Sequence, residues 1–253
     1  MTNFPDKIFG IDTKAAYDRI MNAPDIKPEE EKLEDKLETE EKTGVDKNIS
    51  PHLSEYIHLP SHNIFVAKEV TLKEKNWYTS HEAAQDLNGR MLTLREFIDF
   101  LLLLKSGDAK DGEGNPISKS VLTHMYRKIV DTHEPYRGEW LDARFTKSRG
   151  DLIINYNHKK LITGRLRSLL PTKLERTLEH LRSNSLVDLN QFNKQGLPEK
   201  AGSDFFYSSP KEGLVASFSC SSVFAGLDCR KDPEGLAIYV GVRLVYDNIG
   251  VSK

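Results

Sequence analysis

The sequence predicts an α+β domain that follows a charged N-terminal arm. Two adjacent segments, Asn76–Leu87 and Leu94–Lys105, have the apolar spacing of helices. Runs of β-branched and aromatic residues before and after these segments have the composition of strands. Residues 27–47 consist largely of Glu and Lys, which separates an arm over residues 1–50 from a domain over residues 51–253.

The arm has the composition of a solvated segment. Leu33 and Leu37 are among its few apolar side chains, and Glu and Lys recur at helical spacing in Lys27–Lys47. Such a segment buries too little apolar surface to fold by itself. We therefore expect an exposed helix or a flexible arm, with a helix that docks on a partner as the alternative.

Two strands and a helix are predicted at the start of the domain. Tyr56–Leu59 and Ile64–Val70 are apolar and β-branched, as strands are. The helix Asn76–Leu87 is expected to end at the pair Asn88-Gly89, which suits a C-cap. Its buried face would contain Trp77, Ala84 and Leu87.

A capping box marks the start of the next helix. Thr93 is a candidate N-cap, and Glu96 follows three residues later. Leu94–Lys105 is apolar on much of its circumference, which predicts the central core helix. After a loop over Gly107–Pro116, a third helix is predicted over Val121–Thr132.

The second half of the domain is predicted to be mainly β-structure. Glu139–Lys147 and Asp151–His158 form a candidate hairpin. We expect a helix over Leu174–Arg182 and a loop over Gln195–Pro210. The last two predicted strands are Leu214–Ser219 and Leu236–Tyr246.

Composition excludes several classes of protein. The chain has 36 basic and 38 acidic residues, so its net charge of -2 provides no general attraction for nucleic acid. Its longest apolar run, Phe100–Leu104, is far shorter than the roughly 20 residues of a membrane span. Met1–Gly10 lacks the hydrophobic core of a signal peptide, and the sequence leaves the compartment unknown. Two cysteines, Cys220 and Cys229, are too few for a disulfide framework.

The helix pair carries the first resemblance to a known family. Asn76–Leu101 reads NWYTSHEAAQDLNGRMLTLREFIDFL, with a tryptophan that opens one helix and a Gly-Arg turn before the next. It resembles the two-helix signature of C-type-lectin-fold domains, where Gly-Arg-Leu-Pro-Thr joins the helices. Met91-Leu92-Thr93 stands in place of Leu-Pro-Thr. The resemblance implies a C-type lectin-like fold, in which two helices flank small antiparallel sheets.

The C-terminal block carries the second resemblance. Val215–Val245 ends in Gly-Val-Arg-Leu-Val, similar to the closing strand of formylglycine-generating-enzyme-like and phage variable proteins. The block resembles the variable region of proteins diversified by retroelements, particularly those of archaea and their viruses. This implies a variable region over about residues 205–246, with a constant frame of Val215, Ala216, Phe218, Ala225, Leu227, Asp228, Cys229, Pro233, Gly241, Val242 and Arg243.

The same resemblance implies a function and a binding face. Such proteins recognise a protein or a cell-surface ligand without catalysis, on a virion or at a cell surface, and they need no cofactor. Exposed Phe224 and Tyr239 would serve as aromatic anchors. The ligand-binding positions would be Ser217, Ser219, Ser221, Ser222, Phe224, Gly226, Arg230, Asp232, Leu236, Ile238 and Tyr239.

Strand periodicity agrees with this interpretation. Successive side chains of a strand point to opposite faces, so Val215, Ser217 and Ser219 share one face while Ala216 and Phe218 share the other. We expect the serines to face solvent and Phe218 to anchor the sheet. Changes at solvent-facing positions would then cost within about 0.5 kcal/mol each.

Two alternative functions remain open on this fold. Formylglycine-generating or sulfatase-modifying enzymes use a cysteine pair, and Cys220 and Cys229 lie in the corresponding C-terminal region. The two cysteines do not match that family's active-site pattern, so no enzyme activity is expected. A structural domain without a variable face is the other alternative.

No metal site is expected from the sequence. Calcium-dependent lectins use a Glu-Pro-Asn type loop, but Glu134-Pro135-Tyr136 lacks the amide oxygen that such a loop supplies. The eight histidines are scattered, and no pair has the spacing of a metalloprotease helix.

Two polar segments are interpreted as structural. The basic residues Lys159, Lys160, Arg165 and Arg167 indicate a solvated face. Within Tyr136–Asp142, one arginine and two acids predict a buried ion pair with Trp140 packed above it.

Overall fold

The chain separates into two units, Met1–Ile49 and Ser50–Lys253. This computed structural model describes residues 7–8, 11–12, 52–160, 166–175 and 185–247. In the first unit, β1 (Lys7–Ile8) pairs antiparallel with β2 (Ile11–Asp12). The Glu- and Lys-rich segment 27–47 lies outside the described residues, so its helical or flexible state stays a prediction.

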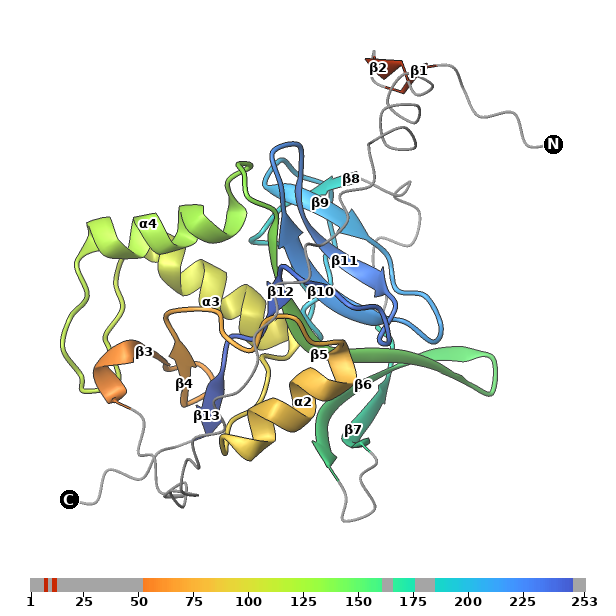
Figure 1. Ribbon diagram of the computed structural model, residues 1–253, viewed down its shortest axis with the longest axis horizontal. Coiled ribbons are helices and arrows are strands. Elements are labelled where there is room, and N and C mark those ends of the chain that lie inside the picture. The colour runs from red at the N-terminus through yellow and green to blue at the C-terminus, as the bar shows by residue number, and fades with distance from the viewer. Residues whose placement is uncertain (1–6, 9–10, 13–51, 161–165, 176–184, 248–253) are drawn as a thin grey trace, which may run out of the picture. The chain divides into compact units, whose positions relative to one another are not determined.

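The second unit is α+β, as predicted, and among its described elements the helices precede most of the strands along the chain (Figure 1). A 3₁₀ turn, η1 (Leu53–Glu55), precedes two strands and three helices. These are β3 (Tyr56–Leu59), β4 (Ile64–Ala67), α2 (Trp77–Asp86), α3 (Leu94–Ser106) and α4 (Lys119–Val130). The later strands are β5 (Arg137–Ser148), β6 (Asp151–Lys160), β7 (Leu166–Lys173), β8 (Ser185–Val187), β9 (Phe205–Ser208), β10 (Val215–Cys220), β11 (Ala225–Lys231), β12 (Val240–Gly241) and β13 (Val245–Asp247).

Side-chain caps define the helix starts. The Asn76 side chain accepts a hydrogen bond from the Thr79 amide at the start of α2. The predicted capping box of α3 is confirmed, because Thr93 and Glu96 each accept from the other's backbone amide. α3 then ends at Gly107, whose positive φ of 73° suits glycine.

The strands form a large sheet and a small one. The large sheet has the order β7-β6-β5-β10-β11-β9-β8, and β12 pairs with the first residues of β5. It is mostly antiparallel, with parallel pairing only between β9 and β11 and between β12 and β5 among the described strands. The small sheet has the order β13-β4-β3. One sheet is therefore larger than the small sheets that the family resemblance implies.

The middle of the large sheet is covered on both faces. Leu141, Ala143 and Phe145 of β5 belong to the core cluster that includes α3 and α4. Trp140 alternates with them and belongs to a second cluster, which contains Trp77 of α2 and the C-terminal residues Val240 and Val242. Figure 1 shows α2 at β6 and β5, apart from α3 and α4. Burial on both faces decides where the predicted ligand-binding residues lie.

Several predicted elements differ from the structure because tertiary contacts override local patterns. The predicted loop over Gln195–Pro210 contains β9, and β11 was not predicted at all. The predicted strand Leu236–Tyr246 is broken, with β12 and β13 joining different sheets. Leu87 is exposed, so its predicted burial is wrong. Leu174 follows β7 directly and is not helical, and residues 176–184 of the predicted helix lie outside the described residues.

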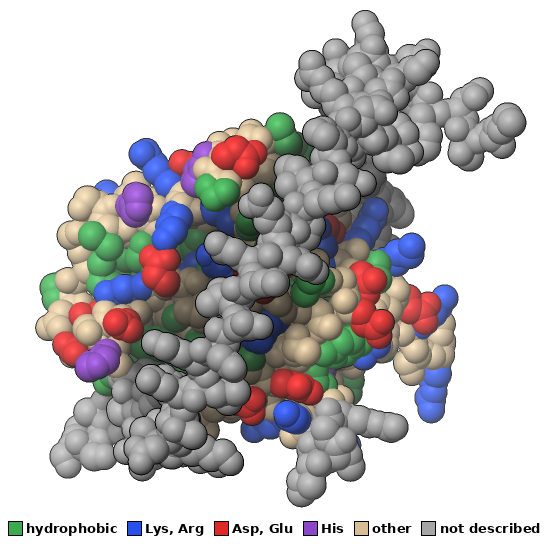
Figure 2. All heavy atoms as spheres, viewed as in Figure 1, with side chains coloured by type: hydrophobic (Ala, Val, Ile, Leu, Met, Phe, Trp, Pro, Cys, Tyr) green, Lys and Arg blue, Asp and Glu red, His purple; other side chains and the backbone are tan. Residues whose placement is uncertain are grey.

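The surface of the described residues is mixed in character. Figure 2 shows acidic, basic and hydrophobic side chains interspersed over one face. Among the helices that the structure describes, none is long and apolar enough to cross a membrane.

Candidate functional site

The predicted ligand-binding positions do not form one exposed face. Ser217 and Ser219 have exposed fractions of 0% and 1%, and Ser221 and Gly226 are also buried. Phe224 is half-buried. The predicted positions that are exposed are Ser222, Arg230, Asp232, Leu236, Ile238 and Tyr239.

The prediction that Ser217 and Ser219 face solvent is wrong for a physical reason. The alternation along β10 is as predicted, since Phe218 packs on Phe97 of α3 and the serines point to the opposite face. That opposite face, however, is covered: Ser217 is paired with Trp140, and Gly138, the partner of Ser219, contacts Val240. Periodicity sorts residues between two faces but does not say that either face is wet.

The predicted frame residues, in contrast, are nearly all buried, as a constant frame requires. Ten of the eleven predicted frame residues are buried, and only Asp228 is half-buried. The C-terminal block is thus mostly core, and its exposed residues are concentrated in the turn before β11 and the segment between β11 and β12.

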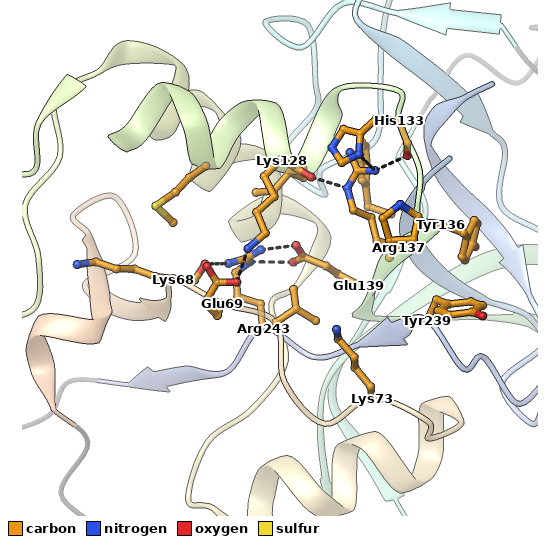
Figure 3. A pocket seen from close by; sticks show the side chains of 16 residues that line it. Lys68, Glu69, Lys73, Lys128, His133, Tyr136, Arg137, Glu139, Tyr239 and Arg243 are labelled. Atoms are coloured by element: carbon orange, nitrogen blue, oxygen red, sulfur yellow. Dashed lines mark hydrogen bonds and ion pairs between the residues drawn. The ribbon is translucent and has the colours of Figure 1, made fainter. Parts of the chain in front are cut away.

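A pocket of about 320 Å³ lies beside that last segment (Figure 3). Its walls come from the residues that follow β4, from α4, from the start of β5 and from the C-terminal segment. Its floor is apolar, with Phe218, Met125 and Ile129 all buried. The polar lining residues include Lys68, Glu69, Lys73, Lys128, His133, Tyr136, Arg137, Glu139, Tyr239 and Arg243.

A buried ion pair lies in the wall of the pocket. The guanidinium of Arg243 donates to both carboxylate oxygens of Glu139, at 2.9 and 2.5 Å, and both side chains are about 5% exposed. Arg243 also donates to the carbonyls of Ala67 and Lys68 and lies over the Phe100 ring. The pair therefore ties β5 to the small sheet and is fully engaged with protein groups.

The sequence predicted a buried ion pair in Tyr136–Asp142, and the structure corrects its partners. Glu139 pairs with Arg243, which lies 104 residues away, and not with Arg137. Arg137 instead donates to the backbone carbonyls of Lys128, Asp131 and His133, at the C-terminal end of α4. A cation at that position complements the helix dipole and fixes the loop that follows α4.

The pocket is basic although the protein is slightly acidic. The basic lining residues are Lys68, Lys73, Lys128, Arg137 and Arg243, and the acidic ones are Glu69 and Glu139. Lys68 is engaged outside the pocket, because its Nζ donates to the carbonyl of Ser54 at 2.6 Å. Lys128 pairs with Glu69 at 2.6 Å, whereas Lys73 has no ion-pair or hydrogen-bond partner among the described residues. Figure 3 shows Lys73 pointing toward the Glu139–Arg243 pair. This charge distribution favours an anionic group.

Two aromatic rings lie at one side of the pocket. Tyr136 and Tyr239 meet edge to face, with ring centroids 6.2 Å apart. Tyr239 is 57% exposed, and the neighbouring Leu236 and Ile238 are also exposed. An apolar group attached to a bound anion would therefore meet aromatic and aliphatic surface.

A second cluster of chemical interest is buried in the domain. His81 of α2, Asp142 of β5 and His158 of β6 place their ligand atoms within 4.8 Å of one another. Residue separations of 61 and 16 positions gave no local motif, so the sequence interpretation of scattered histidines missed this cluster. The sequence signal nearest to this cluster was Asp142, an acid that directly follows Trp140 and Leu141 and precedes Ala143 in β5.

The two cysteines lack the features of a reactive pair. Both are buried and free, and burial raises the pKa of each thiol. Cys220 donates to the carbonyl of Asp131 at 2.9 Å, and Cys229 lies in the core next to strand β9.

Comparisons with known proteins add no relative. No family model matches the chain, and no curated protein and no solved structure matches it.

Proposed function

We propose that this protein is a non-catalytic ligand-binding protein whose pocket takes an anionic group of a protein or cell-surface ligand. The observation that carries the proposal is the pocket's charge. Glu69 and Glu139 are paired with Lys128 and Arg243, which leaves Lys73 and the carbonyl-bound Arg137 as positive charges without a carboxylate beside an apolar floor. In a chain of net charge -2, such a local excess of positive charge concentrates anions at this place.

The lining residues have distinct roles in this proposal. Lys73, with no described partner, supplies the free cation that meets the ligand. Lys128 is held by Glu69 and supplies a second positive charge at the opening. The Glu139–Arg243 pair keeps the wall rigid, and Tyr136 and Tyr239 contact an apolar part of the ligand.

We further propose that the domain has a C-type lectin-like fold and that a retroelement diversifies its exposed C-terminal residues. The capped helix pair α2 and α3 and the buried frame support a C-type lectin-like domain of the retroelement-diversified type. The variable positions are then the exposed ones, Ser222, Arg230, Asp232, Leu236, Ile238 and Tyr239.

The neighbouring DNA tests the diversification. A near-copy of the codons for Ser208–Val245, differing where the copy has adenines, and a reverse-transcriptase gene are expected beside the coding sequence. If neither is present, the diversification is wrong, while the pocket proposal stands on its own test.

Phenyl phosphate tests the pocket, because it joins one anionic group to one aromatic ring. We expect amide NMR shifts at Lys73, Lys128 and Tyr239 on titration, and affinity that falls as salt is added. Lys73→Glu should weaken binding by about 1 kcal/mol, roughly fivefold, because it reverses an exposed charge. Tyr239→Ala should weaken phenyl phosphate more than inorganic phosphate.

Lys211→Glu is the matched control, since it makes the same charge change outside the pocket lining. If Lys73→Glu and Lys211→Glu weaken phenyl phosphate binding equally, the loss comes from the net charge of the protein and not from the pocket, which would contradict the proposal. Shifts that avoid the pocket residues would also contradict it.

A further inference from the structure

The second cluster joins three secondary-structure elements. His81 lies on α2, Asp142 on β5 and His158 on β6, and all three side chains are buried. The Nδ1 of His158 lies 2.5 Å from Oδ1 of Asp142, and the backbone amide of His158 donates to Oδ2 at 3.2 Å. Both oxygens of the Asp142 carboxylate thus have a hydrogen-bond partner on β6.

The imidazole of His81, in contrast, lacks hydrogen bonds. Its Nε2 lies 3.6 Å from Oδ1 of Asp142, beyond hydrogen-bond distance, and neither ring nitrogen has a hydrogen-bond partner among the described residues. The side chain is only 1% exposed. A buried polar atom without a partner costs free energy, so this ring calls for an explanation.

Trp77 holds the two imidazole rings in place. Its ring packs edge to face on His81 and on His158, with centroids 4.3 and 4.9 Å away. Its Nε1 donates to the carbonyl of Leu141 at 2.9 Å, next to Asp142 in β5. The unpartnered nitrogens of His81 therefore belong to a well-packed arrangement.

We propose that His81, Asp142 and His158 bind one divalent transition-metal ion of the zinc class. Two imidazoles and one carboxylate are ligands that Zn²⁺ and its neighbours in the first transition row accept. The unpartnered Nε2 of His81, directed toward the Asp142 carboxylate, supplies the ligand that the protein leaves unused.

The charge state of the cluster suits this use. Burial lowers the pKa of His81 to about 4, so its ring is neutral at pH 7 and keeps a lone pair for a metal. Burial acts to raise the pKa of Asp142, but the hydrogen bonds from His158 are among the contacts that bring it below its usual value, and the negative charge of the carboxylate offsets part of the ion's charge.

Metal binding requires one local change. Two atoms that each lie about 2.0–2.2 Å from one ion are about 3 Å or more apart. The 2.5 Å contact between His158 and Asp142 must therefore open, and Nδ1 of His158 must give up its proton while Nε2 carries one, so that a neutral ring offers the Nδ1 lone pair to the ion. The ion would link α2 to the β5–β6 hairpin.

Cobalt provides the direct test on the full-length protein. After treatment with a chelator, titration with Co²⁺ should give visible d–d absorption that saturates at one ion per chain. The tryptophan fluorescence, to which Trp77 and Trp140 both contribute, should fall with the same midpoint, and the melting temperature should rise with the logarithm of free Co²⁺. No visible absorption and no thermal shift would overturn the proposal.

A matched pair of variants locates the ion. His81→Phe keeps an aromatic ring against Trp77 but removes a ligand, and we expect more than about 100-fold weaker binding. His124→Phe makes the same change at an exposed position of α4 and should bind as the wild type does. Unchanged binding by His81→Phe would overturn the proposal.

A spectroscopic measurement keeps the proposal testable if His81→Phe does not fold. X-ray absorption at the zinc edge of the loaded wild-type protein should show two imidazole ligands. Fewer than two imidazoles would place the ion elsewhere and overturn the proposal.

Discussion

The Glu139–Arg243 pair offers the sharpest test of how the pocket is held together. Glu139→Gln keeps the shape of the side chain but removes the charge that faces the guanidinium. Arg243 would then be about 5% exposed with only the carbonyls of Ala67 and Lys68 and one amide oxygen as acceptors. Removing one partner of a buried pair typically costs 3–5 kcal/mol. Because the amide retains one acceptor, we expect about 3 kcal/mol.

Urea unfolding at pH 7 measures this cost as a change in midpoint at constant slope. The double variant Glu139→Leu with Arg243→Met replaces the pair by apolar side chains. It should be more stable than the sum of its two single variants predicts, because each single variant leaves one charge buried alone. A cost below about 1 kcal/mol for Glu139→Gln would mean that water screens the pair. The Glu139–Arg243 pair would then not hold the pocket wall rigid.

Three further predictions concern burial. Ser217→Ala should raise the free energy of unfolding by about 1 kcal/mol, since its buried hydroxyl has no described partner, whereas exposed Arg230→Ser should change it by within about 0.5 kcal/mol. Urea unfolding checks both, and a loss of stability in Ser217→Ala would show that the hydroxyl makes a hydrogen bond and contradict the prediction. Cys220 and Cys229 should not react with a thiol reagent until the protein unfolds, and fast labelling of the native protein would revive the enzyme alternative. Burial, with help from Tyr246, raises the pKa of Tyr56 to about 12, so the unfolded chain loses this proton first and stability should fall as pH rises from about 10 to 12. Tyr56→Phe should make the fall in melting temperature over that range less steep, with Tyr126 still contributing to it, and an unchanged slope would argue against the shift.

Local patterns determined much of the secondary structure of this protein. Thr93 and Glu96 specify the start of α3 because both partners of a capping box lie within one turn. The β5–β6 hairpin follows from two strand-like runs around Ser148–Gly150 for the same reason. The α+β class is the sum of such local preferences.

Local patterns failed where a strand's neighbours decide its environment. The alternation in β10 correctly separated Phe218 from Ser217 and Ser219, but the face of the serines is covered where Trp140 of β5 pairs with Ser217 and Val240 of β12 lies at Gly138, the partner of Ser219. β11 and β9 also escaped prediction, since their pairing depends on strands elsewhere in the chain.

The sequence by itself determined which residues start helices, which alternate along strands and that the chain carries little net charge. Only the tertiary structure decided which face of β10 is buried, that Glu139 meets Arg243, and that His81, Asp142 and His158 converge beside Trp77. The physical reason is range: propensities, caps and periodicity act over a few residues, whereas both candidate sites are built from segments that only sheet pairing and core packing bring together.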